Sequence, residues 1–295
     1  MTPNFRQNIA NIIFISAVFV FIFGCACPSE KNVGDSGNDD NKTAANTEKT
    51  STKNDNANKS SAKDKGDFIV EYATVSNARY TEIDKQIKGE RVLEKAASDL
   101  NKSISLPVDI TLRTKDCDEV NAFYDPKDAS ITVCYELMEH FFKLFKTTGK
   151  NDKESYNLMF DAIRFVFLHE LGHALIDVHE IPIAGSEEDA ADRLSTYICL
   201  EELGDEGARS AIAAAEAFEI ESKNSDGKDL VFYDNHKLGQ QRFYDIVCSL
   251  YGYNPDKYSD VVGKGLLPKE RAVSCQSEYE RLQTSWGKLL KPLRK

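Results

Sequence analysis

The pattern of apolar and polar residues predicts a small sheet followed by helices. Four short runs of alternating or clustered apolar residues are typical of β-strands: 68–72, 108–112, 120–124 and 131–134. Spacings of three and four residues predict helices elsewhere: 82–100, 137–145, 156–178, one opening at Gly185 or Ser186, and 208–218, 240–251 and 269–290. Strands first and helices afterwards favour an α+β fold with a mostly helical C-terminal part.

The first 66 residues lack the pattern of a folded domain. The apolar run 12–23 follows Arg6 and ends at Gly24-Cys25, which is typical of an export signal and shorter than the roughly 20 residues of a membrane-spanning helix. Residues 22–25 resemble the bacterial lipoprotein processing site, so we expect lipidation at Cys25; the alternative is an uncleaved membrane anchor.

The segment after Cys25 is almost wholly small or polar up to residue 66, and such a segment cannot bury enough apolar surface to fold. We therefore expect a signal peptide over 1–25, a disordered tether over 26–66 and one domain over 67–295. The domain would be exported and lipid-anchored to the bacterial cell envelope, with the membrane as a partner through its anchor.

The charge of the chain excludes one class of partner. The sequence holds 48 acidic and 37 basic residues, which gives a formal net charge of −11. A nucleic-acid-binding protein would normally present a basic face, so nucleic acid is not expected as a partner.

Five cysteines lie in the predicted domain: Cys117, Cys134, Cys199, Cys248 and Cys275. None forms the C-x-x-C pair of a thiolate zinc site, and an oxidising compartment favours disulfides. Cys117 and Cys134 flank the predicted hairpin, and Cys248 and Cys275 bracket a loop between two helices, so we expect these two disulfides. Cys199 lies in a helical pattern and is expected to be a buried thiol.

A pattern that can bind a metal ion lies inside the predicted helix 156–178. Residues 169–173 read H-E-L-G-H. Positions i and i+4 share one face of a helix, so His169 and His173 can reach the same ion. Catalytic zinc keeps three protein ligands and a water whose pKa it lowers, and Glu170 would take a proton from that water and pass it to the leaving amine. A chance match is expected about once in a hundred chains of this length.

The acidic cluster after this helix offers the third ligand. Glu188 follows 15 residues after His173, beyond a helix break, so its carboxylate can face the first helix. Asp192, one turn further, can accept a hydrogen bond from a ligating imidazole and fix its tautomer. The alternative is a solvated acidic helix N-terminus. Glu187 and Asp189 are expected to point to other faces of the helix, as capping or solvated residues.

These two motifs together resemble the zinc signature of gluzincin metallopeptidases, H-E-x-x-H with E-x-x-A-D. The resemblance implies a zincin-like fold with an edge strand, Zn²⁺ as cofactor, Glu188 as third ligand and Asp192 as support for a histidine. More narrowly, the chain resembles a bacterial family of unknown function described as putative metallopeptidases. The similar segments span most of residues 68–295: 121–126, 134–137, the zinc motifs, 241–244 with Cys248, and 267–268 with Arg271 and Cys275.

Residues 121–124 read N-A-F-Y and resemble the Asn-Ala-x-Tyr strand of neprilysin-like peptidases. The resemblance implies that Asn121 and Ala122 bind a substrate peptide as an added strand, which needs an exposed sheet edge near the metal. The alternative is an ordinary hairpin strand.

A site that hydrolyses a peptide bond also needs a hydrogen-bond donor for the oxyanion that develops on the attacked carbonyl. His236 resembles, by its order in the chain, the downstream histidine of gluzincins, and Arg242 and Tyr244 are the other candidates. His140, on an apolar helix, is expected to be structural, and His179 an exposed residue at a helix end.

The sequence therefore predicts a zinc metallopeptidase that acts on peptide or protein substrates. Two alternatives stay open: a catalytically silent, zinc-containing lipoprotein that binds peptides, and an envelope structural protein without a metal. Glu170 favours catalysis, because a structural metal site needs no base between its histidines.

Overall fold

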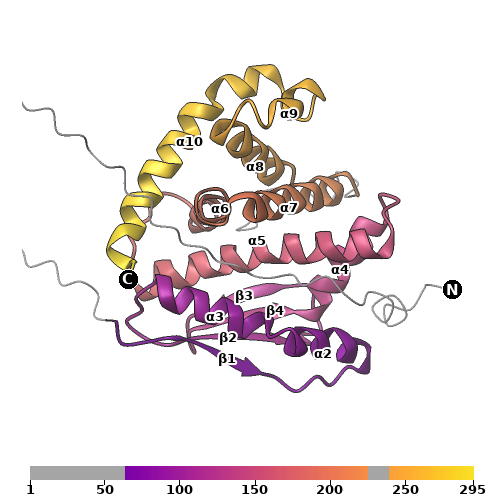
Figure 1. The fold of residues 1–295 in the computed structure, drawn as a ribbon, viewed down its shortest axis with the longest axis vertical. Helices are drawn as coiled ribbons and strands as arrows, with labels where there is room; N and C mark the ends of the chain where they lie inside the picture. The colour runs from indigo at the N-terminus through magenta and orange to yellow at the C-terminus, as the bar shows by residue number, and fades with distance from the viewer. Residues whose placement is uncertain (1–63, 225–238) are drawn as a thin grey trace, which may run out of the picture.

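The computed structural model describes residues 64–224 and 239–295, and its α+β architecture confirms the expected fold class (Figure 1). The sheet has the order β1-β2-β4-β3. Its strands are β1 (Phe68–Tyr72), β2 (Ile110–Lys115), β3 (Ala122–Asp125) and β4 (Ser130–Cys134). β1, β2 and β4 are parallel, whereas β3 pairs antiparallel with β4 and forms one edge. The predicted signal peptide, Cys25 and nearly all of the tether lie outside the described residues.

The helical elements, in chain order, are η1 (Ala78–Tyr80), α2 (Thr81–Gly89), α3 (Val92–Ser103), α4 (Tyr135–Lys146), α5 (Asp152–Val178), α6 (Glu187–Tyr197), the π-helical turn η2 (Ile198–Glu202), α7 (Gly204–Asn224), α8 (Gly239–Tyr253), α9 (Ser259–Gly263), α10 (Lys269–Leu290) and η3 (Lys291–Leu293). Of the helices in the described ranges, none combines the length and apolar character needed to cross a membrane.

The prediction of one continuous helix over 82–100 is wrong. α2 ends at Gly89, and Arg91 adopts a left-handed backbone with φ of 55° before α3 begins. Glycine is a poor helix former, so the break falls where helical propensity is lowest. The apolar spacing continues across the break because α2 and α3 both turn buried side chains toward the same core.

α3 and α5 lie on the same face of the sheet. Val133 of β4, Leu93 of α3 and Ile163 of α5 line one small internal cavity, which places both helices over that face. α3 packs against β1 and β2, and α5 packs against β3 and β4. α5 therefore runs beside the antiparallel edge strand.

α5 is buried on nearly all sides, which explains why it is so apolar. It begins with a capping box, in which the Asn151 side chain accepts from the Glu154 backbone N–H and Glu154 accepts from that of Asn151. Beyond the sheet it also packs against α4, α6 and α7. Fully buried residues such as Phe165 and Leu168 surround the two histidines of the motif.

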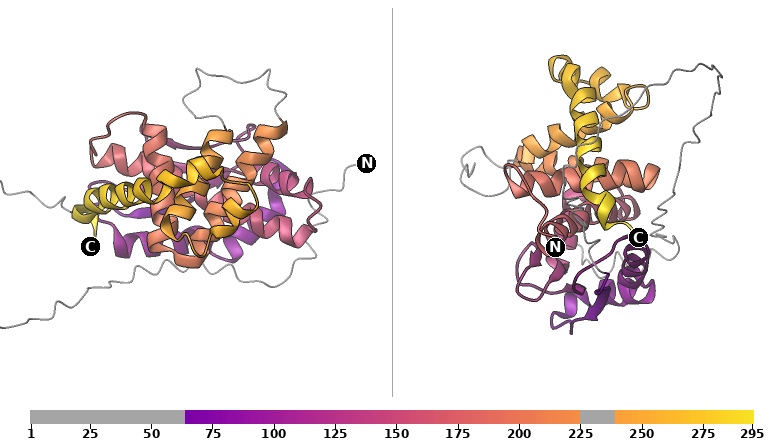
Figure 2. Two further views of the ribbon diagram at one scale, coloured as in Figure 1. Left: turned by 90° about the horizontal axis from the view of Figure 1, so that it is seen from above. Right: turned by 90° about the vertical axis from the view of Figure 1, so that its left-hand side faces the viewer.

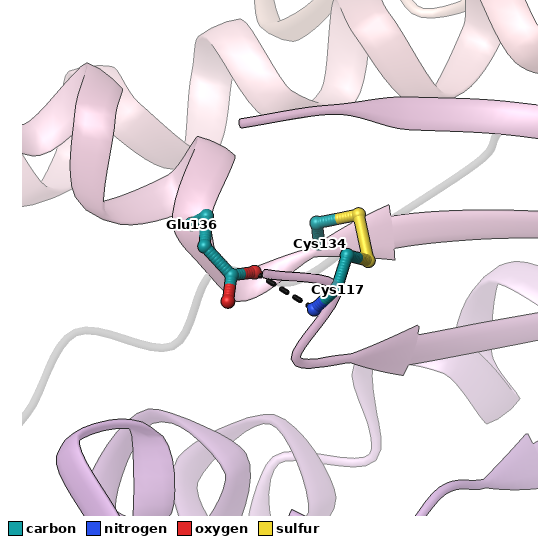
Figure 3. Close-up of side chains that lie close together, drawn as sticks. All are labelled: Cys117, Cys134 and Glu136. Atoms are coloured by element: carbon teal, nitrogen blue, oxygen red, sulfur yellow. Dashed lines mark hydrogen bonds between the residues drawn. A yellow bond between two sulfur atoms is a disulfide. The ribbon is translucent and has the colours of Figure 1, made fainter. Parts of the chain in front are cut away.

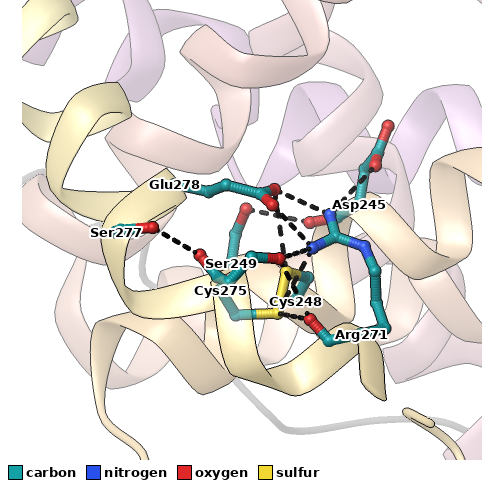
Figure 4. Close-up of a disulfide and its surroundings, with 8 residues drawn as sticks. Asp245, Cys248, Ser249, Arg271, Cys275, Ser277 and Glu278 are labelled. Carbon is teal, nitrogen blue, oxygen red and sulfur yellow. Dashed lines mark hydrogen bonds and ion pairs between the residues drawn. A yellow bond between two sulfur atoms is a disulfide. The ribbon is translucent and has the colours of Figure 1, made fainter. Parts of the chain in front are cut away.

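The C-terminal helices stack outward from α5. α7 packs on α5, α8 on α7 and α10 on α8, and Figure 2 shows α10 running along this stack. The disulfide between Cys248 and Cys275 joins α8 to α10, beside the ion pair of Arg271 with Glu278 (Figure 4). The structure also contains the expected Cys117–Cys134 disulfide and the expected buried free thiol, Cys199.

Candidate metal centre

The approach of α6 to α5 is set by two small residues. A Cβ atom at Gly172 would lie 3.0 Å from the Ala191 Cα atom and 3.1 Å from its Cβ atom. Only glycine on α5 opposite alanine on α6 gives this spacing without displacing a neighbour. This close contact brings the first turn of α6, with its acidic residues, over His169 and His173.

His169, His173 and Glu188 converge at this point. Each offers one ligand atom, and these atoms lie within 4.8 Å of one another. The His169 and His173 Nε2 atoms are 3.2 Å apart, and Glu188 carboxylate oxygens lie 3.2 Å and 3.4 Å from them, respectively. The set fits zinc, which binds imidazole nitrogen and carboxylate oxygen and keeps a fourth position for water at catalytic sites.

The electrostatics of the site also favour a cation. Burial disfavours a charged His169, but the carboxylates of Asp192 and Glu188 outweigh that effect and raise the pKa of His169 to about 9. The pKa of His173 is likewise raised, because the Glu188 and Glu187 carboxylates outweigh its burial. Carboxylates that stabilise a proton on these rings would stabilise a divalent cation at the same place.

Each histidine has a carboxylate at its other ring nitrogen. Asp192 Oδ1 lies 2.8 Å from His169 Nδ1, as the sequence predicts. Glu187 Oε1 lies 2.7 Å from His173 Nδ1. The expectation that Glu187 points to another face as a capping or solvated residue is therefore wrong: although its side chain is half exposed, the first turn of α6 places its carboxylate against the ring. Both contacts direct the Nε2 atoms toward the proposed ion.

Arg242 forms an ion pair with Asp192 and holds its carboxylate in place. Its guanidinium donates two hydrogen bonds to the carboxylate, 2.9 Å from Nε to Oδ2 and 2.6 Å from Nη2 to Oδ1, and stacks over the Phe218 ring. Burial opposes ionisation of Asp192, yet the Arg242 charge and the His169 hydrogen bond outweigh it and hold the Asp192 pKa well below its usual value. Arg242 was a candidate oxyanion donor, and its commitment to Asp192 argues against that role.

Glu170 is buried and lies against β3. Its Oε2 atom accepts a hydrogen bond of 2.9 Å from the backbone N–H of Tyr124 in β3. Burial raises its pKa above that of an ordinary glutamate, against the lowering effect of the two histidines. The candidate base is thus held between the candidate metal ligands and the edge strand.

A cleft of about 750 Å³ opens over the site. Its walls come from β3 on one side and from α5 and α6 on the other: Asn121, Ala122, Phe123, Tyr124, Pro126, Glu170, His173, Asp177, Ser186, Glu187 and Glu188. The candidate substrate residues Asn121 and Ala122 therefore lie in the same cleft as the candidate base. Within the described part of the chain, neither Arg242 nor Tyr244 is among the cleft residues.

The remaining histidines lie elsewhere. His140 Nε2 is 2.7 Å from Glu221 Oε1 and joins α4 to α7, which is a structural contact. His179 was expected to be exposed, and this is wrong: its side chain is half-buried at the end of α5. Its burial lowers its pKa. His236 lies outside the described residues.

A protein-family comparison covers most of the domain. The model of the family DUF4344, described as a putative metallopeptidase, matches residues 72–290. No curated protein and no solved structure matches the chain.

Proposed function

The chain belongs to this family of putative metallopeptidases, and from that premise we propose that it is a zinc-dependent peptidase. His169, His173 and Glu188 would hold the ion. One observation carries the proposal: three ligand atoms within 4.8 Å of one another lie beside a buried glutamate in an open cleft. A structural metal site would have no use for that glutamate or for the cleft.

A zinc ion bound there would supply the Lewis acidity that lowers the pKa of a water and polarises the scissile carbonyl. Glu170 would act as general base and then as general acid. Its burial raises its pKa, which makes its carboxylate a better proton acceptor than an exposed glutamate. It would take the proton of the attacking water and pass it to the departing amine.

The substrate would lie along β3. Asn121 O accepts from Cys134 N, and Ala122 faces Val133 in the antiparallel register. Alternate residues of an antiparallel strand point their backbone groups away from the partner strand, so those of Ala122 and Tyr124 face the cleft side of the edge. A peptide added there would pair with Ala122, and Asn121 would bind it from the strand's beginning.

The remaining parts of the proposal extend the sequence predictions. His236, six residues before Arg242 in the chain, would stabilise the oxyanion. The fold would be zincin-like. Lipidation at Cys25 and export would place the domain at the cell envelope, where it would act on peptides or proteins.

The test is a combined metal analysis and peptide-library digest of the purified protein. We expect about one zinc ion per chain, cleavage of some library peptides, loss of cleavage after chelation and recovery when zinc is returned. A folded protein that binds no zinc and cleaves nothing would contradict the proposal. A protein that holds zinc and binds peptides without cleaving them would be a silent binder instead.

A further inference from the structure

β3 is held by few partners for a strand that would position a substrate. It has four residues and lies at the edge of the sheet, so among the described strands only β4 pairs with it. Toward α5 it is fastened through Tyr124, whose N–H bonds Glu170 and whose hydroxyl donates to Asp177 at 2.7 Å. Both residues that accept these bonds lie in the cleft, where a bound peptide would compete for the same space.

A disulfide closes the chain around this strand. Cys117 lies five residues before β3 and Cys134 is the last residue of β4, so the covalent loop encloses β3 and its turn. The bond lies at the end where β3 begins, because Cys134 N donates to Asn121 O at 3.1 Å. Asn121 and Ala122, the proposed peptide-binding residues, thus lie inside this loop, at the end that the disulfide closes.

Two carboxylates also hold the chain around Cys117 through hydrogen bonds. The Glu136 side chain, at the start of α4, accepts from Cys117 N at 3.1 Å and from Asp118 N at 3.2 Å, as Figure 3 shows for Cys117. Asp116 accepts from the backbone N–H groups of Ser76 and Asn77 at 3.0 Å and 2.8 Å. The chain turns sharply at Asp118, which has a φ of 60°. Residues 116–118, shortly before β3, are therefore held by hydrogen bonds as well as by the disulfide.

The metal ligands do not depend on this loop. His169, His173 and Glu188 lie on α5 and α6, whose spacing is set by the contact of Gly172 with Ala191. Opening the disulfide would remove the covalent constraint on β3 and leave the α5–α6 contact in place.

We propose that the Cys117–Cys134 disulfide positions β3 for peptide binding, so that the peptidase needs this bond to bind substrate but not to hold its metal. The inference rests on the proposed function. If the strand without its disulfide adopts the binding conformation about one time in ten, the apparent affinity for peptide falls about tenfold.

The test is a comparison of two double variants of the full chain. C117A/C134A removes the disulfide at β3, and C248A/C275A removes the one between α8 and α10 as a matched control. Each is assayed for KM and kcat on a library-derived peptide and for zinc content. We expect C117A/C134A to raise KM about tenfold with kcat within about threefold and one zinc retained, and C248A/C275A to leave KM unchanged.

A third variant covers the case in which C117A/C134A does not fold. Glu136→Gln keeps the disulfide but replaces one of the two carboxylate oxygens that hold the loop, so KM should rise about threefold with unchanged zinc content. Unchanged KM in the folded disulfide variant, or unchanged KM in Glu136→Gln when the disulfide variant is unfolded, overturns the inference. A wild type that cleaves no peptide contradicts the proposed function instead.

Discussion

Replacing Arg242 with methionine tests whether its ion pair with Asp192 keeps His169, a proposed metal ligand, in place. The guanidinium donates two hydrogen bonds to the Asp192 carboxylate, at 2.9 Å and 2.6 Å, and Asp192 Oδ1 lies 2.8 Å from His169 Nδ1. Methionine keeps an apolar stem against Phe218 and removes the charge and every donor. The variant leaves the Asp192 carboxylate without its counter-charge.

The size of the effect follows from burial. The Arg242 and Asp192 side chains are 14% and 17% exposed. Removal of one partner from a buried pair costs about 3–5 kcal/mol, and this residual exposure places the expected loss of unfolding free energy near 3 kcal/mol. Because Asp192 would no longer fix the His169 ring, zinc affinity should fall about 10- to 100-fold.

The loss should depend on pH. The Asp192 pKa lies well below its usual value in the folded protein, so this carboxylate contributes stability above the unfolded pKa of about 3.9 and loses it as pH falls. Arg242→Met removes the main cause of the low pKa. The stability difference between variant and wild type should therefore be full at neutral pH and shrink in acid.

The assay is urea unfolding of the zinc-free protein, paired with a chelator competition for zinc affinity. Arg209→Met is the matched control, because Arg209 Nη2 lies 3.8 Å from Glu206 and these side chains are 57% and 40% exposed. The control should change the unfolding free energy by less than about 0.5 kcal/mol. An Arg242→Met protein within about 1 kcal/mol of wild type, with equal zinc affinity, would refute the reasoning.

Two further predictions concern packing and reactivity. Gly172→Ala should lower the unfolding free energy by about 1–3 kcal/mol and weaken zinc binding, because the added Cβ atom would press on Ala191 and move α6 away. Gly89→Ala is the control: open space surrounds Gly89, so this variant should be neutral or slightly stabilising in the same denaturation assay. Cys199 should resist iodoacetamide at pH 8 in the native protein and react after unfolding, because burial raises its pKa to about 12. Mass spectrometry of the alkylated protein would show the difference. Rapid labelling of the native thiol would contradict the prediction.

The parts of the site that follow from helix geometry could be predicted from the sequence. Two histidines four residues apart on a helix must share a face, so the approach of His169 to His173 needed no tertiary information. The position of Glu188 followed from the need for one more ligand. The Cys117–Cys134 pairing followed from its place around one hairpin.

Contacts that depend on how separate helices pack could not be predicted in the same way. Arg242 is 50 residues from Asp192, and nothing in the local pattern of α8 shows that its side chain points toward α6. Glu187 lies in the first turn of a helix, where acidic residues are common because they stabilise the helix N-terminus. That local role explains Glu187 in the sequence, so nothing there predicted its contact with His173. β2 begins at Ile110, not at residue 108, because pairing with β1 and β4 sets the ends of a strand.

Glu170→Gln tests the central claim most directly. The substitution keeps the size of the side chain and the metal ligands, and it removes the carboxylate that would take the proton of the attacking water. With zinc content matched to wild type, we predict that hydrolysis of a peptide cleaved by the wild type falls by at least about 10²-fold. A zinc-loaded Glu170→Gln protein that cleaves this peptide at the wild-type rate would contradict the account.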